Sequence, residues 1–104
     1  MEKRLVYMTA GSLAEARAIG RDLVSNRLAA CVNILDHMRS LYRWEGEVKE
    51  DEEVVIIAKT RASLIPRVIE RVTSIHAYEC PCVLSLAVSE GNKPFLDWIE
   101  AETA

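Results

Sequence analysis

Apolar and polar positions along the chain switch repeatedly between extended and helical spacing, and their order predicts a β-α-β-β-α-β-α succession. Residues 3–9 contain an apolar run without alternation, which is typical of a strand buried on both faces. Apolar residues then recur at helical spacing from Ser12 to about Ser25, and Ser12 with Glu15 fits a capping box. Asn26 is predicted to end this helix, because asparagine tolerates a left-handed backbone.

Residues 29–60 form two long extended segments around a tight connection at residues 44–47. Gly46 supplies the positive φ that a hairpin turn often requires. Each arm of about 15 residues would measure roughly 50 Å when fully extended. A globular chain of this length is only about 33 Å across. We therefore predict a hairpin that projects beyond the body of the fold, with Trp44 near its tip.

The second half of the chain predicts another helix, a strand and a short final helix. Ser63 is the predicted N-cap of the first of these helices, because Pro66 then falls in the first turn, where a missing N–H costs nothing. Pro81 indicates a sheet edge or the entry to a strand, since proline cannot donate to a strand ladder. Asn92 is predicted to cap the last helix.

The first six predicted elements match the split βαβ arrangement of ferredoxin-like folds. We therefore predict a single domain over residues 1–104, of the α+β class. It is a ferredoxin-like βαββαβ sandwich with an additional short C-terminal helix and a long central β-hairpin. Right-handed crossovers place both main helices on one face of the sheet. The strands at residues 5–8 and 54–58 are apolar on both faces, so self-association is expected to cover the open face.

The composition is that of a globular protein, and it argues against several classes of function. The net charge of −3 and the pI of about 5.4 disfavour a nucleic-acid partner, which needs a clustered basic surface. No apolar run approaches the ~20 residues of a membrane span, and no export signal is recognisable. Three cysteines leave one unpaired in any disulfide framework, which favours a reducing cytoplasm. Hydrolase and phosphate-loop motifs are missing from the sequence, so we do not expect an enzyme.

Five segments carry a resemblance to a known family: RLAACVNIL (residues 27–35), SLYRWEGEV (40–48), IIAKTR (56–61), HAYECP (76–81) and GNKPFLDWI (91–99). In this order they resemble the CutA family of divalent-cation-tolerance proteins. The resemblance implies a ferredoxin-like homotrimer, cytoplasmic in bacteria and associated with tolerance of copper and other divalent metals, without an established enzymatic activity. The family commonly has proline at Ala77, an aliphatic residue at Cys80 and a polar or acidic residue at Cys82.

The stretch after the second main helix concentrates side chains that bind metals. His76, Cys80 and Cys82 lie within seven residues, and two thiolates on one side of an extended chain can hold a soft ion with help from a histidine. Alternatively, Cys82 shares its strand face with Leu84 and Leu86 and serves as a small core residue. A histidine after a helix can also simply satisfy free carbonyl groups.

Cys31 lies in the first arm of the hairpin, out of phase with its apolar neighbours. It is either a thiol ligand of a copper site or a tolerated small residue. His76, Cys80 and Cys31 are thus the predicted metal ligands. Copper or another divalent metal is the predicted ion, and no organic cofactor is implied.

The resemblance also assigns a ligand cleft between subunits. His76, Tyr78 and Glu79 match the family motif at this cleft, and Trp44, Lys59 and Trp98 lie in matching segments. Aromatic rings together with one lysine and one carboxylate can form a small-molecule pocket. The predicted cleft residues are therefore Trp44, Lys59, Tyr78, Glu79 and Trp98.

Two further polar features favour a solvated surface. His37, beside Asp36, is interpreted as an exposed strand histidine. Residues 45–53 hold six carboxylates against the single Lys49. Neighbouring strand residues face opposite ways, so the six carboxylates cannot converge on one ion, and we interpret them as a charged edge that discourages aggregation.

The sequence thus favours a cytoplasmic homotrimer that binds divalent metal, copper foremost, and contributes to divalent cation tolerance. The alternative is a trimeric small-molecule sensor or protein-interaction module of the signalling type, which uses its inter-subunit clefts. Neither hypothesis involves nucleic acid or a membrane.

Overall fold

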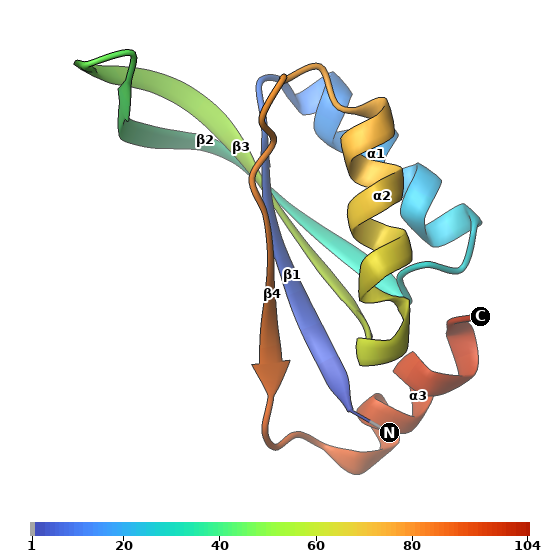
Figure 1. Ribbon diagram of the computed structural model, residues 1–104. Coiled ribbons are helices and arrows are strands. Elements are labelled where there is room, and N and C mark those ends of the chain that lie inside the picture. The colour runs from blue at the N-terminus through green and yellow to red at the C-terminus, as the bar shows by residue number, and fades with distance from the viewer. Residues whose placement is uncertain (1) are drawn as a thin grey trace.

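A computed structural model describes residues 2–104 and arranges them as four strands, three α-helices and one 3-10 turn. The elements are β1 (Lys3–Ala10), α1 (Leu13–Ser25), β2 (Cys31–Trp44), β3 (Glu47–Arg61), the 3-10 turn Ala62–Leu64, α2 (Ile65–Ile75), β4 (Val83–Val88) and α3 (Lys93–Glu102). The strands form one antiparallel sheet in the order β2-β3-β1-β4, shown in Figure 1. The predicted α+β class and the ferredoxin-like order of elements are confirmed.

The hydrophobic core lies between the sheet and the two helices α1 and α2, which cover the same face (Figure 1). Alternate residues of β1 and β3 point to this face, because side chains of a strand alternate between its two sides. The largest fully buried side chains are Met8, Ile19, Leu23, Ile56, Val6, Val68, Val72 and Thr60. Each buried aliphatic side chain stabilises the fold by about 1.5–3 kcal/mol.

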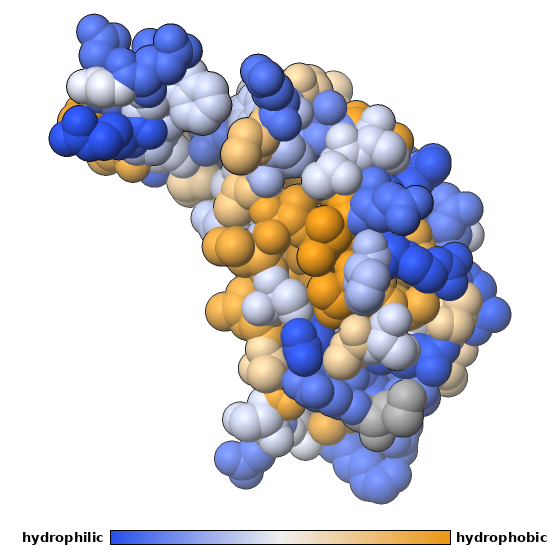
Figure 2. Space-filling view, in the orientation of Figure 1, coloured by the Kyte–Doolittle hydropathy of each residue, from blue (hydrophilic) through white to orange (hydrophobic). Residues whose placement is uncertain are grey.

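The opposite face of the sheet is apolar and largely open. In β4, Leu84 is 58% exposed and Leu86 is 50% exposed, opposite Tyr7 and Leu5 of β1. Figure 2 shows apolar side chains at the surface along β4 and between β4 and α2. The predicted core role of Cys82 is therefore wrong for the single chain, because α1 and α2 cover the face of Met8 and not the face of Leu84.

The hairpin of β2 and β3 projects beyond the rest of the sheet (Figure 1), and the molecule measures 44 × 25 × 23 Å. Glu45 and Gly46 form its turn with φ angles of 51° and 80°, which is the left-handed backbone that a tight hairpin turn uses. Leu41 and Val48 are 69% and 68% exposed on the projecting arms. The prediction of a hairpin that projects beyond the body of the fold is confirmed.

A β-bulge interrupts the hairpin where it leaves the body of the sheet. Leu35 pairs with Val55 and Met38 pairs with Glu53, so Asp36 and His37 together lie opposite the single residue between them. His37 has a φ of 64°, which is uncommon for a residue with a side chain. The carboxylate of Asp36 accepts a hydrogen bond of 2.8 Å from the backbone N–H of His37 and supports this conformation.

The predicted ends of α1 are half correct. Ser12 is the N-cap, and its hydroxyl accepts a hydrogen bond of 3.1 Å from the backbone N–H of Glu15. Glu15 does not return to Ser12, however, since its carboxylate accepts from the N–H of Gly11 at 3.2 Å. Asn26 is the C-cap with a φ of −91°, and the left-handed residue is instead Arg27 with a φ of 57°.

The predicted caps of the later helices differ more. Ser63 lies inside the 3-10 turn, and Leu64 is the N-cap of α2, because the chain tightens into i→i+3 bonding before the helix begins. Pro66 does lie in the first turn. Asn92 is the N-cap of α3, although its side chain makes no capping hydrogen bond.

Ion pairs attach the C-terminal helix to the sheet. Glu100 of α3 lies 2.7 Å from the amine of Lys3 and 2.8 Å from the guanidinium of Arg61. The Lys3 amine, with Arg61, holds the pKa of the Glu100 carboxyl below its ordinary value. These contacts place α3 at the end of the sheet opposite the hairpin (Figure 1).

Candidate functional site

The loop between α2 and β4 is held by a buried histidine. The Nε2 atom of His76 lies 2.8 Å from the backbone oxygen of Thr9, and Nδ1 accepts a hydrogen bond of 3.0 Å from the N–H of Tyr78. Since Nδ1 accepts, Nε2 carries the proton and donates to Thr9. Both ring nitrogens of His76 are therefore used inside the chain, and its side chain is 0% exposed.

Glu15 adds a second anchor for the same loop. Its carboxylate accepts a hydrogen bond of 2.7 Å from the N–H of Ala77 and lies 3.5 Å from Nδ1 of His76. Glu15, which the sequence suggests as part of the capping box of α1, thus also connects the start of α1 to the loop after α2. This connection fixes the position of the next residue, Tyr78.

A cavity of about 430 Å³ opens beside this loop, between β1, the hairpin and the entry to β4. Its lining consists of Thr9, Tyr42, Trp44, Glu53, Tyr78, Glu79, Cys80 and Cys82. The structure therefore brings three of the predicted cleft residues, Trp44, Tyr78 and Glu79, to one place together with the predicted ligand Cys80. The sequence did not indicate that Tyr42, Glu53 and Thr9 line the cavity, because they reach it only through the pairing register of β1 and β2 with β3.

Carboxylates hold the hydroxyl groups at this cavity. Tyr78 donates a hydrogen bond of 2.9 Å to Glu53, and Tyr42 donates to Asp51. Burial and the hydrogen bond to Glu53 raise the pKa of the Tyr78 phenol, so Tyr78 remains a neutral donor. Burial and the negative charge of Glu53 likewise raise the pKa of the Cys82 thiol.

The other two predicted cleft residues lie elsewhere. The Lys59 amine donates to the side-chain oxygen of Asn33, and Lys59 lines a second cavity of about 270 Å³ beside α3. The Trp98 ring packs on Phe95, with ring centroids 5.4 Å apart. Lys59 lies opposite Leu5 near the far end of the sheet, so it does not reach the cavity beside the hairpin.

The predicted metal ligands do not assemble within one chain. All three cysteines are free thiols; Cys80 is exposed, and Cys82 and Cys31 are half-buried. Cys31 begins β2 opposite Lys59, away from the loop that carries Cys80. Across residues 2–104, His76, Cys80 and Cys31 do not form a three-ligand cluster.

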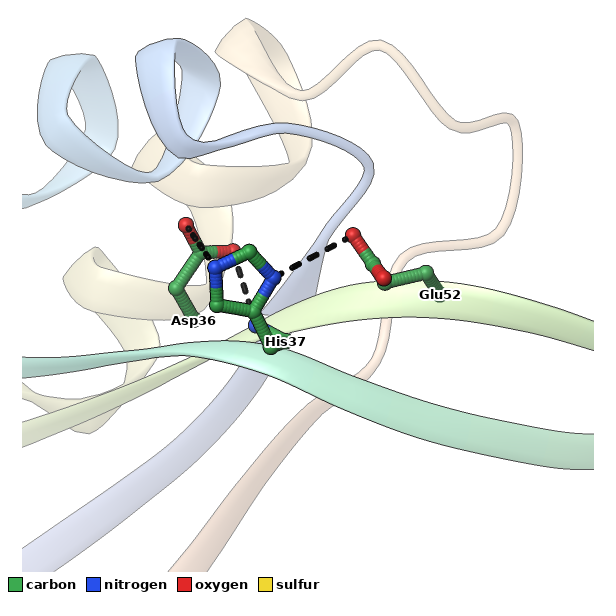
Figure 3. Close-up of side chains that lie close together, drawn as sticks. All are labelled: Asp36, His37 and Glu52. Atoms are coloured by element: carbon green, nitrogen blue, oxygen red, sulfur yellow. Dashed lines mark hydrogen bonds and ion pairs between the residues drawn. The ribbon is translucent and has the colours of Figure 1, made fainter.

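A different cluster of metal-binding side chains lies at the β-bulge, shown in Figure 3. The imidazole of His37 lies between two carboxylates, with Nε2 3.6 Å from Asp36 and Nδ1 3.5 Å from Glu52. One ligand atom from each of the three residues lies within 4.8 Å of the others. The prediction of His37 as an exposed strand histidine is confirmed, since its side chain is 78% exposed in β2. Strand parity alone does not predict that the bulge brings its ring close to Glu52.

Comparison with known proteins agrees with this architecture. The family model of the CutA1 divalent ion tolerance protein matches residues 4–102. The chain belongs to the CutA1 family. It is 43% identical over 101 residues to the divalent-cation tolerance protein CutA of Thermus thermophilus, covering 97% of this chain and 98% of that protein. A solved Thermus CutA1 structure matches with a TM-score of 0.96 at 42% identity, over 98% of this chain and 99% of that one.

Other CutA relatives differ in length and stated location. Mouse protein CutA is 41% identical over 97 residues, which is 93% of this chain but only 55% of the mouse protein. A solved CutA structure from Archaeoglobus fulgidus is named periplasmic. It matches with a TM-score of 0.94 at 38% identity, over 96% of this chain and 97% of that one. The names of these relatives describe tolerance or the family alone and indicate no enzymatic activity.

None of the helices found in residues 2–104 has the length and apolar character needed to cross a membrane.

Proposed function

We propose that this CutA-family protein binds a divalent cation, copper foremost, and contributes in this way to divalent cation tolerance. The observation that carries the proposal is the cluster of Asp36, His37 and Glu52 at the β-bulge. One imidazole and two carboxylates are borderline and hard ligands, a donor set that suits Cu(II), Ni(II) or Zn(II). Among these ions Cu(II) forms the strongest complexes with a given set of ligands.

The spacing of the cluster fits such an ion after small side-chain movements. Two atoms bound to one metal at about 2.1 Å lie roughly 3–4 Å apart. The present nitrogen-to-oxygen distances of 3.5 and 3.6 Å fall in that range, although the two nitrogens face different carboxylates. The His37 side chain is 78% exposed, so rotation of its ring toward both carboxylates meets little steric resistance.

The thiol ligands remain a separate prediction. A site that uses His76 would have to break its hydrogen bonds to Thr9 and Tyr78, which costs about 1 kcal/mol or more for each. Cys80 is exposed at the cavity and carries no such cost. A thiol site therefore requires Cys80 together with ligands that another subunit contributes.

Calorimetric titration of Cu(II) into metal-free protein tests the proposal. We expect binding by the wild-type protein, and we expect His37→Ala and Glu52→Gln to weaken it at least about tenfold, because losing even a residue that only orients a metal ligand typically weakens metal binding by about this factor. Glu45→Gln removes an acid of the same hairpin outside the cluster and serves as the control. If His37→Ala binds copper as tightly as the wild type while Cys80→Ser does not, the thiol site replaces the bulge site.

We also propose that the protein is a homotrimer in the cytoplasm. The exposed apolar face with Leu84 and Leu86, and the projecting hairpin with its exposed Leu41 and Val48, support self-association. Three free cysteines support a reducing compartment. A monomer mass in light scattering at micromolar concentration would refute the trimer, and recovery of the protein outside the cytoplasm on cell fractionation would refute the location.

A second function is favoured by the cavity beside the hairpin. It joins Trp44, Tyr78 and Glu79 in a space within the ~300–1,000 Å³ of small-molecule sites. A trimeric small-molecule sensor or interaction module would use this cavity. A metabolite that raises the melting temperature in the presence of a metal chelator, with Trp44→Leu or Tyr78→Leu abolishing the rise, would support it.

A further inference from the structure

The cavity beside the hairpin has an unusual wall. Three aromatic side chains line it, namely Tyr42, Trp44 and Tyr78, together with the two carboxylates of Glu53 and Glu79. Among residues 2–104 of a single chain, no lysine, arginine or histidine lines it. We propose that this cavity binds a small organic cation of the alkylammonium class. The inference rests on the sensor function proposed above and specifies the ligand of that site.

The electrostatics of the wall favour a positive charge. Glu79 makes no hydrogen bond or ion pair with residues 2–104, so its charge is available to a ligand. The Glu53 carboxylate accepts one hydrogen bond from Tyr78, and it also lines the cavity. Burial and, to a smaller extent, the charge of Glu53 raise the pKa of the neighbouring Cys82 thiol.

The aromatic rings favour an organic cation over a metal ion. Cations bind the faces of Trp and Tyr rings, each contact contributing about two- to fivefold in affinity at an exposed site. In the single chain Tyr42, Trp44 and Tyr78 are each more than a third exposed, so that no other residue of the same chain covers their rings completely. A hard divalent ion instead requires about six oxygen ligands. Among residues 2–104 the lining offers two carboxylates, one threonine and two tyrosine hydroxyls, and both of these hydroxyls already donate to carboxylates. An alkylammonium ion combines the required charge with an apolar chain for the rest of the wall.

Three probes of equal chain length separate charge from size: n-butylammonium, 1-butanol and n-butyrate. Trp44 is the reporter, in a Trp98→Phe background that removes the other tryptophan, which does not line the cavity. The titrations are made at pH 7 in excess metal chelator, so copper cannot contribute. We expect saturable quenching of Trp44 fluorescence by n-butylammonium and binding at least about tenfold weaker for the alcohol and the butyrate.

Two pairs of variants test the wall. Glu79→Gln should weaken n-butylammonium binding at least about threefold, whereas Glu90→Gln, which removes an equal charge outside the cavity, should not. Tyr42→Leu removes a ring and should weaken binding about two- to fivefold, whereas Tyr42→Phe keeps the ring and should retain most of the affinity. Circular dichroism of each variant checks that the fold is retained.

Equal binding of n-butylammonium and 1-butanol, or an unchanged affinity in Glu79→Gln, overturns the inference. The lack of any binding by n-butylammonium overturns it as well. If a neutral or anionic metabolite then raises the melting temperature through Trp44 and Tyr78, the sensor function stands and only the ligand class is refuted. If no metabolite tested raises the melting temperature either, the alkylammonium ligand and the sensor function are refuted together.

Discussion

Removal of the Glu15 carboxylate should destabilise the fold far more than removal of an ordinary surface acid. This side chain is 18% exposed and accepts hydrogen bonds from the N–H groups of Gly11 and Ala77. A hydrogen bond to a charged group contributes about 1.5–3 kcal/mol. Because water can reach both N–H groups, we take the lower value and expect Glu15→Ala to cost about 3 kcal/mol.

Glu15→Gln separates the two contributions. The amide oxygen can still accept one hydrogen bond, so we expect about half of the loss, roughly 1.5 kcal/mol. Glu70→Ala is the control, since Glu70 is exposed on α2 and its substitution should change stability by less than about 0.5 kcal/mol. Urea denaturation followed by circular dichroism measures all three, at one protein concentration because self-association makes stability concentration-dependent.

The reasoning about Glu15 would be refuted if Glu15→Ala and Glu70→Ala unfold at the same urea concentration. In a domain of this size each 1 kcal/mol shifts the melting temperature by about 4–8 °C, so the expected loss of about 3 kcal/mol exceeds 10 °C and is easily resolved. Glu15→Ala should also weaken n-butylammonium binding, because Glu15 holds the backbone next to Tyr78 in place.

Three further predictions concern other parts of the molecule. The Arg71 guanidinium holds the pKa of Asp22 below its ordinary value of 3.8, so this pair stabilises the fold above that pH and the stability is lost as pH falls through the lowered pKa. Asp22→Asn should therefore have a lower melting temperature than the wild type at pH 7, and the two melting temperatures should converge between pH 4 and 2. A difference in melting temperature that stays constant with pH would contradict this. Gly46→Ala should cost about 1 kcal/mol in denaturant unfolding, because the φ of Gly46 is 80°, although no atom of residues 2–104 lies within 4 Å of the new methyl group. Unchanged stability would count against the turn geometry. Leu84→Glu should dissociate the trimer in light scattering if the open sheet face forms the interface, and an unchanged trimer mass would exclude that face.

Local sequence signals predicted the fold well where the chain determines structure over a few residues. Ser12 as an N-cap, Gly46 in the hairpin turn and Pro66 in a first helical turn each reflect a backbone preference of the residue itself. The prediction of Ser63 as a helix N-cap was wrong, because the choice between a 3-10 turn and an α-helix depends on how the end of β3 meets α2. The alternation of side chains along a strand correctly placed Leu84 and Leu86 on the same face of the sheet. It does not indicate which of the two faces the helices cover, and these two leucines are exposed.

The candidate sites were harder to predict because they depend on register. Asp36 and His37 are adjacent in the chain, yet Glu52 joins them only because the bulge shifts the pairing of β2 and β3. Glu53 reaches Tyr78 across 25 positions of sequence, which no local pattern indicates. The family resemblance implied a cleft between subunits with five residues, namely Trp44, Lys59, Tyr78, Glu79 and Trp98. Trp44, Tyr78 and Glu79 line one cavity of the single chain, whereas Lys59 and Trp98 lie elsewhere.

The copper site at the β-bulge is the central claim, and crystals soaked in Cu(II) test it most directly. Anomalous diffraction at the copper edge locates the ion without reference to the assumed ligands. We expect an anomalous peak within about 2.2 Å of a ring nitrogen of His37, with oxygens of Asp36 and Glu52 in the same coordination shell. A copper peak at Cys80, with none at the bulge, would contradict it.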